Sequence, residues 1–565
     1  MSLITLSESE CKDCYRCVRD CSVKAIKINN GQAEVVKEKC INCGHCIEIC
    51  LQNAKGVTNH LEKLKRLLKE EKVIASIAPS FPAVFDCSPG QLITALKNLG
   101  FHDVEETSIG AEVIAREYKK LLELENKPLI SACCPAVVSL VEKHYPDLIP
   151  YLSPTISPMI AHAKLIKEIS KDIKVVFIGP CIAKIKEIDW ESSKGAVDLA
   201  ITFDELKGLF SLEGIDYQSL DEDQFRSVSG NWSKAFPVEN GVLKAADISF
   251  GLSTEILSIS GLAECMKTFE DILNDDISPK FIEAMVCSGG CINGPGITSE
   301  LSINSRKERI IRYAQKEDTI DNKFDMDKFK IDTSREYLNC KIEEKIPTEN
   351  QIRLILSQTG KFSDKDELDC GGCGYNSCRE KAIAIYQGLA ELKMCIPYMK
   401  GKMESLADII VESSPNAIIV VGKDMTIQKF NPKADELFNR NDEIAIGHKL
   451  YRYIDPKDYL DAWFNKKSIS QKKVEYKQYN LICEQSVFPL IDYELVIGII
   501  TDVTERENHN ERVAKMKETT LEKANQVIHK QMKVAQEIAG LLGESTSETK
   551  AILYEVRQLM QEEER

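Results

Sequence analysis

The chain has 565 residues, of which 43 % are apolar and 28 % are charged, and its formal net charge is -15. A length of this kind predicts roughly three to five globular domains. The acidic balance excludes a protein built to coat nucleic acid or an anionic membrane, because those partners require an excess of Lys and Arg. No apolar run approaches the ~20 residues that cross a bilayer, and the N-terminus lacks the zones of a secretory signal. We therefore expect a cytoplasmic protein with no nucleic-acid or membrane partner.

The first 58 residues contain a doubled cysteine motif, C-x2-C-x2-C-x3-C, which is typical of two [4Fe-4S] cubanes in one small ferredoxin-like module. In such a run three thiolates wrap one cubane and the fourth reaches across to the other. Zinc also takes four thiolates, but its usual pattern is two C-x2-C pairs. The pattern predicts one set made of Cys11, Cys14, Cys17 and Cys50, and another made of Cys40, Cys43, Cys46 and Cys21.

The chain has 21 cysteines in all, and their clustering favours metal ligation over disulfides in a chain without an export signal. Sixteen fall into four groups of four. Four of the remaining cysteines are expected to be small core residues: Cys87, Cys265, Cys340 and Cys483.

Residues 60–72 read as a charged amphipathic helix, and residues 73–345 alternate apolar β-rich runs with helical stretches. The runs 73–78 and 174–178 predict strands, and 110–124 and 160–170 predict helices. This alternation indicates parallel α/β layers.

Three separated segments of this region carry cysteines at strand-to-helix junctions: 131–138, 177–187 and 284–296. Cys134 directly precedes Pro135 and a helical run, so the helix N-terminus should lower the pKa of the thiol. Cys181 follows a strand, and Lys184 and Glu187 should share its helix face. Cys287 and Cys291 stand among glycines, which let backbone approach a bulky inorganic group. Parallel α/β folds bind ligands at the carboxyl ends of their strands.

These three segments resemble the signature segments of [FeFe]-hydrogenases. The resemblance implies an H-cluster, in which Cys134, Cys181, Cys287 and Cys291 hold a [4Fe-4S] cubane and Cys291 bridges to a di-iron subsite with CO, cyanide and azadithiolate. It implies that Cys133 passes protons and that Lys184 binds a cyanide. It also implies that the loop Ala78, Pro79 and Ser80 lines the other cyanide and that Met285 packs against the cluster.

The sequence departs from hydrogen-producing members at several positions. Gly179 replaces a methionine, Met159 replaces a glutamine, Pro154 falls near a proton-relay serine, and Ser288 replaces a proline. Glu117 is a loose match to one relay glutamate. These changes resemble the sensory branch of the family and predict slow turnover.

Beyond residue 345, the cysteines of residues 346–400 resemble a small iron–sulfur domain of electron-transfer complexes, with zinc as the alternative metal. They predict a third [4Fe-4S] cluster in addition to the H-cluster. The ligands are Cys370, Cys373, Cys378 and Cys395, with a helical stretch before the last one.

Residues 403–506 resemble a PAS sensor domain, with strands at 418–421 and 427–430 and a helix after Asn431 and Pro432. Residues 507–565 are expected to be helical. Their apolar spacing, interrupted by Gln531, suits a coiled coil that ends at Gly540 and Gly543. A homodimer through the PAS domain and this tail is expected.

The fold expected is multidomain α+β and α/β, and the function expected is that of a hydrogen-sensing [FeFe]-hydrogenase. It would split molecular hydrogen into protons and electrons, relay the electrons through its [4Fe-4S] clusters and signal through the PAS domain and tail. A ferredoxin-like carrier and a downstream kinase or phosphatase are possible partners. The alternatives are a metabolic ferredoxin-dependent hydrogenase and a non-catalytic iron–sulfur scaffold protein.

Overall fold

The computed structural model describes residues 3–124, 127–251, 253–316, 324–325, 328–439, 444–542 and 547–562. The chain divides into two compact units, residues 1–399 and 400–565, and each is described by itself. No helix in these described ranges is long and apolar enough to span a membrane.

The first unit begins with a small module of two antiparallel strand pairs. Asn30 and Gly31, both with positive φ, connect β2 to β3, as a tight hairpin turn requires. Its two short helices each start directly after a residue with positive φ, Tyr15 and Gly44. The elements are β1 (Ile4–Leu6), α1 (Arg16–Arg19), β2 (Ile26–Asn29), β3 (Gln32–Val35), α2 (His45–Glu48) and β4 (Lys55–Val57).

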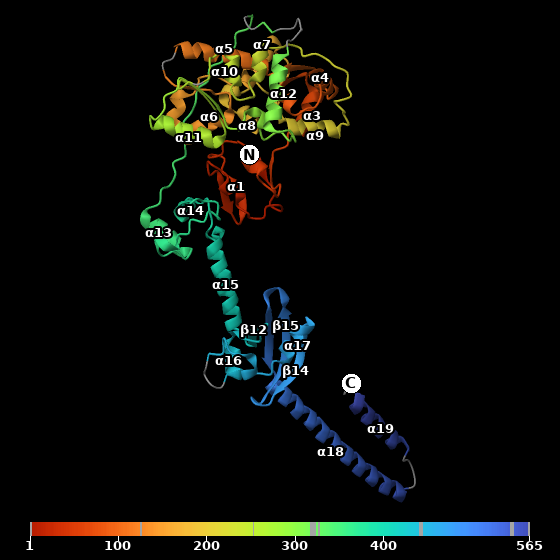
Figure 1. Ribbon diagram of the computed structural model, residues 1–565. Coiled ribbons are helices and arrows are strands. Elements are labelled where there is room, and N and C mark those ends of the chain that lie inside the picture. Colours follow the sequence, from red (N-terminus) through yellow and green to blue (C-terminus); the bar gives the residue numbers. More distant parts are fainter. Residues whose placement is uncertain are drawn as a thin grey trace. The chain divides into compact units, whose positions relative to one another are not determined.

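Two parallel sheets form the centre of the first unit. Figure 1 shows the helices that surround them. The larger sheet has the order β6-β5-β8-β9, and the smaller has the order β10-β11-β7. The parallel α/β layers are thus confirmed, as two sheets. Their strands are β5 (Val73–Ile77), β6 (Asp103–Glu106), β7 (Leu129–Ile130), β8 (Lys174–Gly179), β9 (Leu199–Thr202), β10 (Ile256–Ser260) and β11 (Phe281–Met285).

Helices pack around these sheets and share one apolar core with them. The helices expected at 60–72, 110–124 and 160–170 are confirmed as α3, α5 and α7. Gly110 lets α5 and α7 approach closely, since a Cβ there would lie 2.1 Å from the Pro158 carbonyl oxygen. The helices are α3 (Leu61–Glu70), α4 (Pro89–Asn98), α5 (Ser108–Leu124), α6 (Pro135–His144), α7 (Pro158–Ile169), α8 (Ile182–Glu187), α9 (Phe203–Leu212), α10 (Gly241–Ala245), α11 (Leu262–Leu273) and α12 (Ile303–Gln315).

The segment around α13 (Glu349–Gln358) and α14 (Cys378–Tyr386) packs against the N-terminal module, although it follows the α/β region in sequence. The Ile28 amide donates to the Leu389 carbonyl at 2.9 Å. The Lys24 ammonium donates to the Gly374 carbonyl at 3.1 Å. The two cysteine-rich parts of the chain are therefore neighbours in space.

The second unit is built on one antiparallel sheet of five strands, in the order β13-β12-β16-β15-β14. Both predicted strands and the helix after Asn431 are confirmed, and the Asn431 side chain caps that helix. The elements are β12 (Ala417–Gly422), β13 (Ile427–Phe430), α16 (Pro432–Phe438), α17 (Lys457–Asn465), β14 (Ile469–Tyr476), β15 (Leu481–Leu490) and β16 (Leu495–Asp502).

Long helices flank this sheet in the sequence. Helix α15 (Ile396–Glu412) begins directly after Cys395, and α18 (Thr504–Leu542) and α19 (Ser547–Glu562) follow β16. The expectation of a break at Gly540 is wrong, because α18 runs through it to Leu542. A single glycine weakens a long helix without ending it. The other expected break, Gly543, lies outside the described residues.

Candidate metal centre

The central cysteines follow strand ends from both parallel sheets. Cys134 is the N-cap of α6, with Pro135 as the first helical residue, and Cys181 is the N-cap of α8 after β8. Cys287 and Cys291 follow β11, and positive φ angles at Gly289 and Gly290 turn the loop between them. The junctions of both sheets thus bring thiols to one region.

A cavity of about 90 Å³ lies where these loops meet. Its walls are mostly apolar, and Phe177 and Met159 contribute to them. Most of the expected site residues line it: Ala78, Pro79, Ser80, Cys133, Cys134, Cys181, Lys184, Met285 and Cys291.

Cys287 and Glu187 do not line this cavity. Cys287 lines a neighbouring hollow together with Cys43 of the N-terminal module. Burial raises the pKa of the Cys287 thiol, and the nearby thiols of Cys181, Cys134 and Cys291 raise it further. In the described ranges no three His, Cys, Asp or Glu side chains converge closely enough to hold a single metal ion. The thiols are instead spread over several loops.

Glu187 acts on the cavity through Lys184. Its carboxylate lies 2.8 Å from the Lys184 ammonium, one helical turn away, and only 2 % of its side chain is exposed. The ammonium also donates to the Cys133 carbonyl at 3.2 Å. These two contacts hold the only lysine among the residues that line the cavity.

Cys133 has a partner that the sequence did not point to, the hydroxyl of Tyr118 on α5. The Tyr118 oxygen lies 2.9 Å from the Cys133 sulfur and accepts from the Ala132 amide at 3.0 Å. Burial raises the pKa of the Cys133 thiol to about 12, although the Tyr118 hydrogen bond and the Lys184 ammonium lower it.

At Cys181, burial and the Cys134 thiol raise the pKa of the thiol to about 11, so burial has a larger effect on this pKa than the helix N-terminus. The amides of Ala183 and Lys184 lower the pKa by less. Thiols buried in this way ionise when a metal cation compensates their charge.

The cavity fits an inorganic group with polar ligands. The buried hydroxyls of Ser80 and Ser157 have no hydrogen-bond partner among the described residues. Ser80 lines the cavity, and Ser157 precedes its wall residues Pro158 and Met159. Buried hydroxyls are normally hydrogen-bonded, so an acceptor in this space would satisfy them.

The departures from the hydrogenase pattern have structural counterparts. A Cβ at Gly179 would lie 2.6 Å from the Phe177 ring, so that ring occupies the space of a larger side chain. Met159 is buried in the cavity wall. Glu117 does not line the cavity and pairs with Lys120 at 2.7 Å.

In the N-terminal module, one small cavity is lined by Cys21, Cys40, Cys43 and Cys46, the set that the doubled motif predicts. Burial raises the pKa of the Cys17 thiol, and the nearby thiols of Cys14, Cys11 and Cys50 raise it further. These four cysteines are the other predicted set. Lys55 is buried nearby and lowers the pKa of thiols in both sets, Cys17 and Cys46. The Lys55 ammonium would offset the negative charge of the two thiolate sets. The spacing of the cysteines in the sequence did not predict this lysine.

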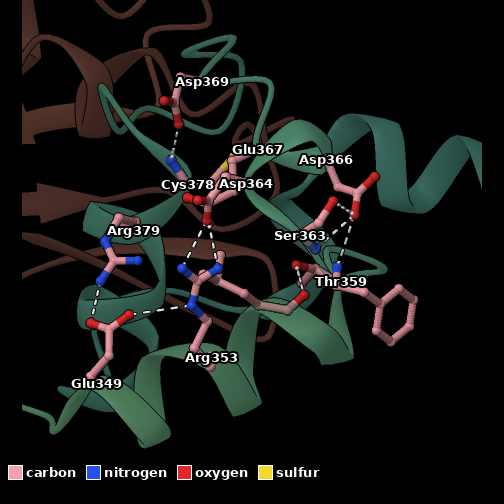
Figure 2. A network of polar contacts seen from close by, with 12 residues as sticks. Glu349, Arg353, Thr359, Ser363, Asp364, Asp366, Glu367, Asp369, Cys378 and Arg379 are labelled. Atoms are coloured by element: carbon pink, nitrogen blue, oxygen red, sulfur yellow. Dashed lines mark hydrogen bonds and ion pairs between the residues drawn. The ribbon is translucent and has the colours of Figure 1, made fainter.

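The last cysteine group also lines one cavity, formed by Cys370, Cys373, Cys378 and Cys395. The Lys361 ammonium donates to the Cys395 sulfur at 3.3 Å. Polar contacts hold the loop around these cysteines in place (Figure 2). The Asp369 carboxylate accepts a hydrogen bond from the Cys378 amide at 2.6 Å, and Arg353 forms an ion pair with Asp364 at 2.8 Å. Arg379 pairs with Glu349 on the preceding helix.

The four remaining cysteines differ in burial. Cys265 and Cys483 are buried as expected. Cys87 is half-buried, and the expectation of a core position is wrong for Cys340, which is exposed. Its amide donates to the Glu142 carbonyl from an extended segment that lies over α6.

Three family models match this chain. Residues 71–295 match the C-terminal domain of the iron-only hydrogenase large subunit, residues 3–51 match a 4Fe-4S dicluster domain, and residues 366–397 match a putative Fe-S cluster domain. Residues 71–295 are therefore an [FeFe]-hydrogenase-like domain, and the chain is a hydrogenase-like iron–sulfur protein.

The curated relatives include both hydrogenases and assembly factors. Iron hydrogenase 1 of Clostridium pasteurianum is 27 % identical over 52 % of this chain and 64 % of its own length. The cytosolic Fe-S cluster assembly factor NAR1 of Yarrowia lipolytica is 26 % identical over 34 % of this chain and 46 % of its own. The chain thus spans less than two thirds of either relative. A solved [FeFe]-hydrogenase structure, HydA(deltaEFG), is 20 % identical over 45 % of this chain and 88 % of its own, with a TM-score of 0.39.

Proposed function

We propose that this protein is a hydrogen-sensing [FeFe]-hydrogenase that splits molecular hydrogen slowly and reports the result through its second unit. The observation that carries the proposal is the single cavity shared by Cys133, Cys134, Cys181, Lys184 and Cys291. An H-cluster bound there would supply the metal chemistry of hydrogen splitting.

The protein's own residues hold and surround that group. Cys134, Cys181, Cys287 and Cys291 are the thiolate ligands, and all of them except Cys287 line the apolar cavity. Lys184, held by Glu187, presents a cation to an anionic ligand. Apolar side chains such as Phe177 and Met285 exclude water, and the Cys133 thiol is the group that moves a proton.

Three further cysteine sets would hold the additional [4Fe-4S] clusters. Two are in the N-terminal module and one is in the segment that packs against it. The contacts between Lys24 and Gly374 and between Ile28 and Leu389 keep these sets together. A ferredoxin-like carrier would exchange electrons with the protein at this end.

The second unit is the proposed output. The strand order of its sheet supports a PAS domain, and exposed apolar residues of α18, including Val527, Val534 and Ile538, support a coiled-coil homodimer. Helix α15 starts at the residue after Cys395, so a charge change at that thiolate set acts on the first turn of the helix.

A second candidate is a non-catalytic iron–sulfur scaffold, which the similarity to assembly factors favours. The two functions differ in one observable. Iron-bound CO and cyanide give infrared bands that a protein with cubanes alone does not have.

The test is infrared spectroscopy of the full-length protein after maturation. We expect CO and cyanide bands that change under hydrogen, and their loss in Cys181→Ala. Cys87→Ala is the matched control, because Cys87 is half-buried and lies outside the cysteine sets. A wild-type protein without these bands would favour the scaffold.

The sensory part needs its own measurement. Hydrogen–deuterium exchange of the intact protein under hydrogen and under argon should show a change of protection in α15 and α18. An unchanged pattern in both helices, with infrared bands present, would favour the metabolic hydrogenase.

A further inference from the structure

A continuous line of buried polar side chains leads away from the central cavity. Thr107 lines the cavity, and its hydroxyl lies 2.9 Å from the Ser76 hydroxyl on β5. The Ser76 oxygen lies 2.8 Å from His162 Nδ1 on α7. His162 Nε2 lies 3.1 Å from a carboxylate oxygen of Glu105 on β6. Each link is within hydrogen-bond distance, so the line has no gap.

The far end of this line reaches the surface. The other carboxylate oxygen of Glu105 lies 3.2 Å from an Arg226 nitrogen, and the Arg226 side chain is 31 % exposed. His162 and Glu105 are 1 % and 3 % exposed, so the steps before Arg226 are shielded from solvent.

We propose that Thr107, Ser76, His162 and Glu105 form a proton relay between the cavity and the surface beside Arg226. The relay rests on the proposed function, since hydrogen splitting at the cavity releases the protons that it carries.

The transfer balances at every step. Thr107 and Ser76 each accept one proton and release their own, so neither changes its charge. His162 accepts a proton at Nδ1 and releases one from Nε2 to the Glu105 carboxylate, which passes it to water beside Arg226. No electron moves along the line. A reorientation of the imidazole ring then restores the starting tautomer.

A second line of polar contacts among the described residues leads from the cavity through Cys133. The Cys133 thiol contacts the Tyr118 hydroxyl, and the Tyr118 hydroxyl forms a hydrogen bond with the Thr155 side chain. The Thr155 hydroxyl lies 3.1 Å from the Ser153 hydroxyl. All three residues beyond Cys133 are buried. Pro154, between Ser153 and Thr155, has no donor to extend this route. Of these two lines, the His162 line ends at a partly exposed side chain, that of Arg226.

His162 also has a packing role that the experiment must separate from proton transfer. Its backbone lies against Gly110, and its ring bridges β5 and β6. Replacing it risks misfolding. Thr107→Val is therefore the primary variant, because it keeps the side-chain shape and removes only the hydroxyl. Ser76→Ala breaks the next link.

The first measurement is the exchange of deuterium gas with water by the full-length matured protein. Thr107→Val and Ser76→Ala should exchange at least about tenfold more slowly than the wild type. Thr155→Val, on the second line, and His60→Phe, which removes a histidine 3.7 Å from Glu205, should stay within about twofold of the wild type. The CO and cyanide bands should be unchanged in all four variants.

The second measurement does not depend on turnover. The infrared difference spectrum between hydrogen and argon should contain a carboxylic-acid band that shifts in heavy water and disappears in Glu105→Gln. Wild-type exchange rates in both Thr107→Val and Ser76→Ala, or slow exchange in Thr155→Val alone, would overturn the relay and leave the proposed function standing. Absent CO and cyanide bands in the wild type would overturn the function itself.

Discussion

The Lys184 ammonium and the Glu187 carboxylate form an ion pair at 2.8 Å, one turn apart on α8, with both side chains largely shielded from solvent. Truncating one member of such a pair leaves the other charge buried without its partner. The pair therefore sets both the position of the cavity lysine and the local stability of α8.

Glu187→Gln should lower the free energy of unfolding by about 1–3 kcal/mol, because the charge-assisted hydrogen bond is lost. Amide hydrogen exchange of α8 measures this effect. Glu191→Gln is the matched control, since Glu191 pairs with Lys194 at the same sequence spacing and is 89 % exposed. It should change stability by less than about 0.5 kcal/mol. Equal effects of the two variants would contradict the importance of burial.

Gly44→Ala should disturb the contact between the N-terminal module and the loop that carries Pro295. A Cβ there would lie 2.4 Å from a Pro295 side-chain atom, and φ is +79°. Gly214→Ala, at φ +66° with open space around it, has the backbone strain without the clash. We expect a lower melting temperature for Gly44→Ala than for Gly214→Ala, together with faster hydrogen exchange in residues 40–50. Identical melting temperatures would count against the clash.

Lys24→Met should loosen the segment that carries the last cysteine group. Lys24 donates to the carbonyls of Val18, Arg19 and Gly374, which joins this segment to the N-terminal module. Hydrogen exchange in residues 366–397 should become faster. Lys27→Met removes an exposed pair with Glu34 and should leave that exchange unchanged. Unaltered exchange in Lys24→Met would show that the apolar contacts alone hold this segment against the N-terminal module.

Glu283→Gln should remove a pH dependence of stability. Burial raises the pKa of the Glu283 carboxyl from 4.5 to about 7, so between these values the folded state binds a proton that the unfolded state does not. The stability contributed by this group is thus fully present below pH 4.5 and is lost as the pH rises to about 7. The total change is roughly 3 kcal/mol. Denaturant unfolding from pH 5 upward should give a falling difference between wild type and variant, and parallel curves would contradict the shift.

Gln531→Leu should strengthen the proposed dimer. Gln531 interrupts the apolar spacing of α18, and a polar residue at a coiled-coil core position lowers stability while selecting the register. Sedimentation should give a lower dissociation constant for the dimer. Glu522→Leu, on the opposite helix face, should leave it unchanged. A monomer at all concentrations in both variants would exclude the coiled coil.

Local patterns were enough to predict several elements of the fold, and they also predict the cysteine sets. The strands β5 and β8 and the helices α5 and α7 follow from apolar periodicity. The short spacing of the N-terminal cysteines predicts that Cys21 and Cys50 are shared between the two sets, because three thiolates of one run wrap a cubane and the fourth reaches across. Cys134 and Cys181 were placed at helix starts because strand, proline and helix signals are adjacent in the chain.

Long-range packing decided the rest. The contact of Lys24 with Gly374 joins residues 350 positions apart, and no local pattern in the sequence predicted it. The line from Thr107 to Glu105 combines two strands and a helix, and none of its residues belongs to a motif. Cysteine is a residue type that is usually buried, which predicts a core position for Cys340, but Cys340 is exposed. Periodicity and ligand spacing act over a few residues, whereas burial, the pKa of a thiol and the partner of a histidine depend on which distant segments the fold brings into contact.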